Sequence, residues 1–183
     1  MNRSDRVIEV PLQPSLVLRL APPADHRLEN WWVEKGGGRP SAAGTHQEPI
    51  TSGYQFKGRS TPYAEGPEMI PWLSLHDSTG NAGVYFGIEF SGCVGFDVVA
   101  AGEPLTVSVT AGIDPSAEDF RSRLARGERF ETPVVFVGCH RGDVDDGANR
   151  LHQYVATHLR PPVSDKRYPL VVNNSWGSGM AVD

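Results

Sequence analysis

The chain has 183 residues, of which 39% are hydrophobic and 21% charged, and its net charge is −5. This length suits one domain, or one domain with part of a second, and allows a core that needs no disulfide support. The acidic balance, without any basic cluster, excludes nucleic acid as an expected partner, because phosphate binding requires grouped lysines and arginines.

No stretch of the sequence predicts membrane insertion or secretion. A membrane span requires ~18 apolar residues, and no run in the sequence approaches that length. The first apolar segment, 16–20, contains Arg19 and makes a poor signal-peptide core. Cys93 and Cys139 form no C-x-x-C pair, so free thiols in a reducing, cytoplasmic setting are expected, with a single disulfide as the alternative.

Short apolar segments bounded by turn residues recur along the chain, and the 20 glycines and 15 prolines favour β structure. The predicted strands span 6–10, 15–20, 28–33, 69–75, 83–90, 93–99, 105–110 and 133–138. Residues 77–81 are expected to close a hairpin, and the continuous apolar run 133–138 is expected to be a central strand. Composition over 36–66 predicts an extended surface loop with one strand near 53–56.

One helix is predicted near the C-terminal end. Asp145 and Asp146 are the predicted N-terminal cap and supply favourable charge for the helix dipole, and Pro161 and Pro162 would end the helix. Its apolar face would consist of residues at spacings of three and four, namely Ala148, Leu151, Val155 and Leu159. A further apolar strand is predicted at 169–173, beyond a domain boundary near 161–166.

Two motifs resemble catalytic signatures without satisfying them. Residues 53–60, GYQFKGRS, resemble a phosphate-binding loop, but Arg59 replaces the lysine and Pro62 disfavours the helix that should follow. Residues 175–177 resemble half of a serine-hydrolase nucleophile elbow, but no aspartate and histidine follow in the required order. An ordinary strand or turn is expected in the first case, and no serine hydrolase in the second.

Candidate metal ligands do not have the spacing of a metal site. Structural zinc sites use tight pairs of ligands, whereas the residues available here are scattered or face apart on a helix. They are Cys139, His140, His152 and His158. We expect surface or internally bonded histidines, no metal and no other cofactor.

Tryptophans are the better candidates for ligand contacts. Trp31, Trp32 and Trp72 are expected in the core, although each could stack on a sugar ring. Trp176 follows the predicted strand at 169–173, and ligands of parallel α/β folds gather at the C-terminal ends of strands. Trp176 is therefore the candidate substrate-binding residue.

Several segments resemble glycoside hydrolase family 36 in order and spacing. Residues 169–180, PLVVNNSWGSGM, are similar to the P-x-x-x-N-[ST]-W run that forms the first strand of that family's catalytic barrel. Similar leading-region segments are GVYFGIEFSG at 83–92, FETP at 130–133, GANRLH at 147–152 and HLRPP at 158–162. The resemblance covers about residues 65–183.

The resemblance implies a mainly β fold and an α-galactosidase-type enzyme. A β-supersandwich of two packed antiparallel sheets, with one helix near its C-terminal end, would span 1–162, and a linker with the first strand of a truncated (β/α)8 barrel would span 163–183. Retaining hydrolysis of terminal α-galactosides needs two carboxyl groups, which in this family are aspartates on later barrel strands. They would lie beyond Asp183, so the chain alone is expected to be inactive. In the full-length enzyme α-galactoside sugars would be partners, and a homo-oligomer is compatible with the resemblance.

Three points stay open on the sequence alone. Residues 177–180, GSGM, depart from the family's usual continuation and leave the substrate preference open. A free-standing carbohydrate-binding β-sandwich module that works through its aromatics is the main alternative. A remnant of a broken gene is a third, in which the apolar strand 169–173 would be an exposed edge prone to pairing.

Overall fold

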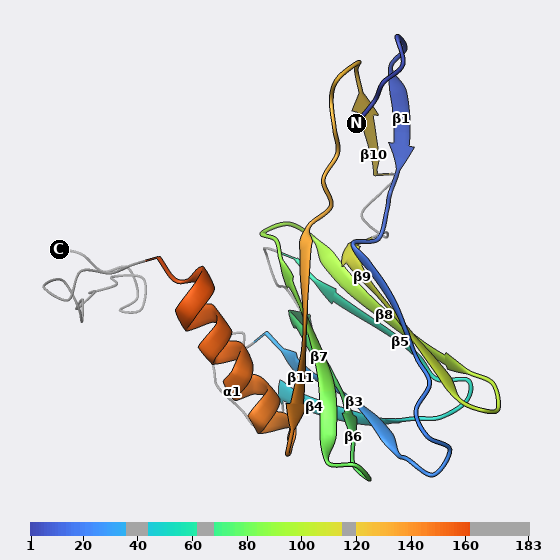
Figure 1. Cartoon of the computed structure of the whole chain (residues 1–183), viewed down its shortest axis with the longest axis vertical. Helices are drawn as coiled ribbons and strands as arrows, with labels where there is room; N and C mark the ends of the chain where they lie inside the picture. Colours follow the sequence, from blue (N-terminus) through green and yellow to red (C-terminus); the bar gives the residue numbers. More distant parts are fainter. Residues whose placement is uncertain (36–43, 62–67, 115–119, 162–183) are drawn as a thin grey trace, which may run out of the picture. The chain divides into compact units, whose positions relative to one another are not determined.

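The computed structural model describes residues 1–35, 44–61, 68–114 and 120–161 (Figure 1). The chain divides into two compact units, Met1–Leu151 and His152–Asp183. All strands of the described residues lie in the first unit, where they form three antiparallel sheets. None of the described helices is long and apolar enough to cross a membrane.

The larger sheet has five strands. They are β3 (Leu28–Glu34), β4 (Thr45–Ile50), β6 (Met69–Asp77), β7 (Ala82–Glu89) and β11 (Val134–Arg141). Their order is β11-β7-β6-β3-β4, and each neighbouring pair is antiparallel. The hairpin predicted at 77–81 is confirmed, since β6 and β7 pair from Trp72 opposite Gly87 to Asp77 opposite Ala82.

A second sheet has four strands, and a separate ribbon has two. The four strands are β2 (Leu16–Leu20), β5 (Gln55–Ser60), β8 (Val94–Ala101) and β9 (Thr106–Ile113), in the order β2-β9-β8-β5. The ribbon consists of β1 (Ile8–Pro11) and β10 (Arg121–Leu124). These sheets join segments that are far apart in the sequence, because β2 pairs with β9 and β1 with β10.

The hydrophobic core lies between the five-stranded and four-stranded sheets. Alternate residues of each strand face it, as the period of two in a half-buried strand requires. Fully buried members are Leu73 and Phe86 from the larger sheet and Phe96, Val98, Val107 and Val109 from the smaller one. The expectation of a β-sandwich is therefore confirmed.

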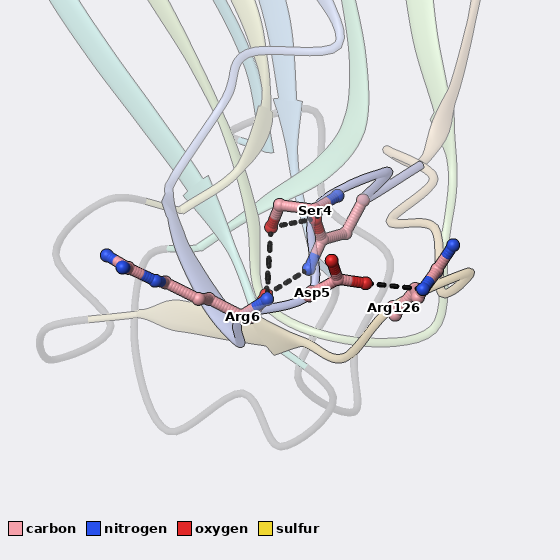
Figure 2. A network of polar contacts seen from close by, with 5 residues as sticks. Ser4, Asp5, Arg6 and Arg126 are labelled. Atoms are coloured by element: carbon pink, nitrogen blue, oxygen red, sulfur yellow. Dashed lines mark hydrogen bonds and ion pairs between the residues drawn. The ribbon is translucent and has the colours of Figure 1, made fainter.

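Asn2 anchors the N-terminal segment to β10. Its buried amide donates a hydrogen bond to the carbonyl oxygen of Leu124, at 2.8 Å, and its Oδ1 accepts from the backbone N–H and hydroxyl of Ser4. The carboxylate of Asp5 forms an ion pair with Arg126 beside this network (Figure 2). Because a buried amide with several partners is costly to remove, Asn2 holds the chain start against the end of β10.

The predicted surface loop over 36–66 is wrong in its described part. Two strands, β4 and β5, occupy most of residues 44–61, where only one short strand near 53–56 was expected. β4 has the polar sequence THQEPI, with no apolar alternation, and pairs only with β3 at the edge of the sheet. Edge strands tolerate such residues, including Pro49, because one side of their backbone needs no strand partner.

The prediction that residues 133–138 form a central strand is also wrong. β11 lies at the edge of the sheet and pairs, among the described strands, only with β7. Val134 and Val137 are 58% and 45% exposed. Packing of individual side chains explains the apolar run instead. Val135 packs against the core, and the ring of Phe136 lies over Gly87, where a Cβ atom would be 1.9 Å from that ring.

The predicted helix is confirmed, but its N-cap is not the predicted one. α1 spans Val144–Tyr154 and continues as a π-helical turn over Val155–Leu159. Asp143 caps it, because its Oδ1 accepts from the N–H of Asp146 at 3.1 Å, and Asp146 Oδ2 accepts in return from the N–H of Asp143 at 3.2 Å. Asp145 and Asp146 thus lie inside the first turn, where their charges still favour the helix dipole.

Both cysteines, Cys93 and Cys139, are free, which agrees with the expectation of free thiols. The strand predicted at 169–173 and the candidate residue Trp176 lie outside the described residues.

Candidate functional site

The outer face of the five-stranded sheet carries a concentration of aromatic and polar side chains. Residues paired directly across neighbouring strands share a face. By this rule Glu29 of β3 and His76 of β6, which are paired, lie on the same face. Trp31 also lies on this face, because side chains two residues apart on a strand point the same way, and the face is opposite to the core. The start of α1 lies against it, because Gly147 of α1 packs on the ring of His140 in β11.

A groove of about 380 Å³ runs between this face and the start of α1. We call it the aromatic groove. Its lining residues are Glu29, Trp31, Trp32, Val33, Thr45, Trp72 and His76 from the sheet side, and Asp143, Val144, Asp145 and Ala148 from the cap and first turns of α1. All of them belong to the first unit.

Tryptophans form the apolar wall of the aromatic groove. Trp72 is only 5% exposed, which confirms its expected burial. Trp31 is half-buried, and its Nε1–H donates a hydrogen bond to Glu29 Oε2 at 3.1 Å, which fixes the plane of the indole. Trp32 stacks on His46, at 5.0 Å between ring centroids, and packs against the core, as expected. The expectation that Trp31 lies in the core is wrong, because its side chain is half-buried on the opposite face; of the three tryptophans it is the one that is neither enclosed nor packed against the core.

Polar groups form the other wall and the floor of the groove. Carboxylates of Glu29, Asp143 and Asp145 line it. On the floor, the indole N–H of Trp72 and Nδ1 of His76 are buried, and neither has a hydrogen-bond partner among the described residues. Buried polar atoms without a partner are unusual and costly, so these two identify a place where the fold leaves hydrogen-bonding capacity unused.

Behind the groove, His76 stacks on His140. Their ring centroids are 5.7 Å apart and nearly parallel, at 7°, and Nε2 of His140 is 3.4 Å from the hydroxyl oxygen of Ser74. The glycine at position 83 permits this arrangement, because a Cβ there would lie 2.3 Å from Nε2 of His140. Burial, and then the charge of nearby His76, hold the pKa of His140 below its ordinary value.

This lowered pKa predicts a pH-dependent stability. The folded state resists protonation of His140, so the unfolded state binds more protons and the free energy of unfolding falls as pH drops below ~6.5. The groups that face the ring include Asp146, which opposes the effect, and Arg150, which reinforces it. Urea unfolding above and below pH ~6.5 should show a smaller pH slope for His140→Gln than for the parent chain.

Phe90→Ala provides the control, because Phe90 is exposed and carries no titratable group. This substitution is expected to leave the pH slope unchanged. If the free energy of unfolding had the same pH slope in His140→Gln and in the parent chain, the assignment of a lowered pKa to His140 would be contradicted.

The remaining sequence candidates are not brought together. Residues 55–60 pair with β8 along their whole length as strand β5, so the phosphate-loop interpretation is excluded, as expected. Cys139 is exposed on β11, His140 is buried, and His158 lies in the π-helical turn. No group of three or more potential metal ligands occurs among the described residues.

Sequence reasoning missed a histidine–carboxylate pair at the β6–β7 turn. Nδ1 of His26 lies 2.5 Å from Oδ2 of Asp77. Burial alone would raise the pKa of Asp77, but hydrogen bonds from the backbone N–H of Gly80, from His26 and from the backbone N–H of Thr79 hold it below its ordinary value. The signal was the turn sequence Asp-Ser-Thr-Gly, since aspartate often accepts such bonds at the start of a turn.

Comparison with known proteins adds information on the fold. No protein-family model matches the sequence, and no curated protein matches it significantly. Among solved structures, α-galactosidase AgaB of glycoside hydrolase family 36 from Geobacillus stearothermophilus matches with a TM-score of 0.72 and 20% identity, over 88% of this chain and 22% of that one. A variant of AgaA from the same organism, in complex with raffinose, gives 0.71 and 20% identity, over 87% and 22%.

A third match is the α-galactosidase from Lactobacillus brevis, with a TM-score of 0.64 and 17% identity, over 84% of this chain and 20% of that one. At these identities the likeness is one of fold. The chain therefore has the fold of a β-rich region of family-36 α-galactosidases, and it spans about 22% of the length of the first of them.

Proposed function

We propose that the chain is the leading, β-rich portion of an α-galactosidase-like glycoside hydrolase of family 36. The observation that carries the proposal is the fold match, which extends over 88% of this chain but only 22% of the matched α-galactosidase. Variants of the matched AgaA were solved in complex with raffinose and with stachyose. The proposed substrates of the whole enzyme are accordingly terminal α-galactosides, hydrolysed with retention.

In this proposal the chain has a supporting part rather than a catalytic one. Residues 1–162 form the sandwich domain, and 163–183 form the linker and the first barrel strand, where Trp176 contacts substrate. Retaining hydrolysis needs a nucleophile and an acid/base ~5 Å apart across the scissile bond. Of the three carboxylates in the aromatic groove, two already have structural partners, since Glu29 accepts from Trp31 and Asp143 caps α1. The catalytic pair is placed beyond Asp183, in an enzyme that acts in the cytoplasm, without a cofactor and as a homo-oligomer.

An assay with a chromogenic α-galactoside tests the proposal. The 183-residue chain is expected to give no turnover, whereas the chain extended by the coding sequence that follows Asp183 in its gene should hydrolyse the substrate. NMR of the first-formed sugar should then detect the α-anomer, as retention requires. Turnover by the 183-residue chain, or an inactive extension without a pair of barrel carboxylates, would contradict it.

A further inference from the structure

We propose that the aromatic groove is itself a binding site for one pyranose ring of a neutral saccharide. The groove lies entirely within the first unit, and its walls come from β3, β6 and the start of α1. The inference does not depend on the hydrolase proposal, because a free-standing module would use the same residues.

The size of the aromatic groove suits a small ligand. Its volume of about 380 Å³ falls within the ~300–1,000 Å³ typical of small-molecule sites. It also combines a flat apolar wall with a few convergent polar groups, which is the usual composition of such sites. A sugar ring presents the matching surfaces, with C–H groups on one face and hydroxyl groups around its edge.

Trp31 supplies a preorganised stacking surface. The hydrogen bond from its indole N–H to Glu29 fixes the ring before any ligand arrives, so little side-chain entropy is lost on binding. Glu29 is opposite His76 in the sheet, so the support for Trp31 is part of the paired strands rather than of a loop. An aromatic side chain held in this way on a rigid element is a suitable anchor for the C–H face of a pyranose.

The polar groups of the groove match hydroxyl groups rather than charges. Carboxylates of Glu29 and Asp145 offer acceptors and would repel an anionic ligand. On the floor, the indole N–H of Trp72 is a donor that lacks an acceptor, and the His76 ring has an unused nitrogen. Both residues are more than nine-tenths buried, so a sugar hydroxyl would bond to them through a bridging water rather than directly.

An amine is the main rival ligand, because an ammonium group would be attracted by the carboxylates and by the tryptophan faces. Direct comparison of sugar binding with amine binding therefore belongs to the test of this proposal.

Calorimetric titration of the 183-residue chain with methyl α-galactoside and with raffinose tests the inference. We expect saturable binding at millimolar sugar, with quenching of tryptophan fluorescence. Trp31→Ala should weaken binding about tenfold, as is usual for a tryptophan anchor. Glu29→Gln should weaken it by a smaller factor, because the amide oxygen can still accept from Trp31.

Phe90→Ala is the matched control, since Phe90 is an exposed aromatic outside the groove. It should bind sugar like the parent chain, and thermal melts should confirm that all variants are folded. Three outcomes would overturn the proposal: no saturable binding at millimolar sugar, tighter binding of putrescine than of either sugar, or equal losses for Trp31→Ala and Phe90→Ala. None of these outcomes bears on whether the extended chain hydrolyses α-galactosides, so the two proposals fail separately.

Discussion

Replacement of Phe86 by alanine is expected to lower the free energy of unfolding by about 4 kcal/mol. Phe86 has 0% exposure, lies on β7 between β11 and β6 of the five-stranded sheet and is paired with Leu73 on β6. Truncation removes buried apolar area and leaves a cavity between two sheets that relax only partly. Urea unfolding followed by fluorescence and circular dichroism measures the loss.

Phe90→Ala is again the matched control, because Phe90 follows the end of β7 and is 47% exposed. We expect it to change the free energy of unfolding by less than about 1 kcal/mol. A double-mutant cycle of Phe86 with Leu73 should give a non-additive coupling, since the two side chains border the same space. A loss below about 1 kcal/mol for Phe86→Ala would contradict the packing of the two sheets at this point.

Replacement of Arg59 by methionine should have the next largest effect, about 3 kcal/mol. Nη2 of Arg59 lies 2.9 Å from Oδ1 of Asp97, and Nε lies 2.9 Å from Oδ1 of Asp114, whose side chain is 8% exposed. The guanidinium also donates to the carbonyl oxygen of Phe96, at 3.1 Å. The Arg59 side chain thus connects β5 with β8 and with the end of β9. Its replacement removes a charged partner of the buried Asp114 carboxylate, which is why the expected cost is large.

The exposed ion pair of Arg123 with Glu9 gives a matched comparison. The side chain of Arg123 is 76% exposed, and its guanidinium lies 2.9 Å from the carboxylate of Glu9. Arg123→Met should cost at most about 1 kcal/mol, and added salt should reduce that cost further. Equal losses for Arg59→Met and Arg123→Met would show that burial does not strengthen the Arg59 interactions.

Apart from β1, the strands that could be predicted from alternation are those that face the core on one side. β9 is an example, because its alternating Val107 and Val109 are fully buried between polar neighbours. β4 and β10 could not be predicted, since THQEPI and RSRL carry no such alternation and are held by pairing with β3 and β1. The place of a strand within its sheet could not be predicted from the sequence either. The apolar run of β11 does not indicate whether that strand has one neighbouring strand or two.

The candidate site was only partly predictable for a related reason. Trp31 and Trp72 stand out in the sequence as sugar-stacking candidates, but their common face depends on the register between β3 and β6. The contacts with α1 depend on Asp143, whose capping role was assigned to residues further along the helix. The stack of His76 on His140 needs three aligned strands, so neither histidine could be paired from its sequence neighbourhood.

The sheet topology also sets an order of events during synthesis. β6 and β7 adjoin along the chain and can pair as soon as both have been made, whereas β2 waits for β9 and β1 waits for β10. Ile8 has Leu124 as its partner, so β1 is synthesised long before the strand with which it pairs. Pairings of such wide sequence separation slow folding. Until β9 emerges, β2 has no neighbouring strand in its sheet, and in that interval the nascent chain is most accessible to chaperones and most prone to aggregation.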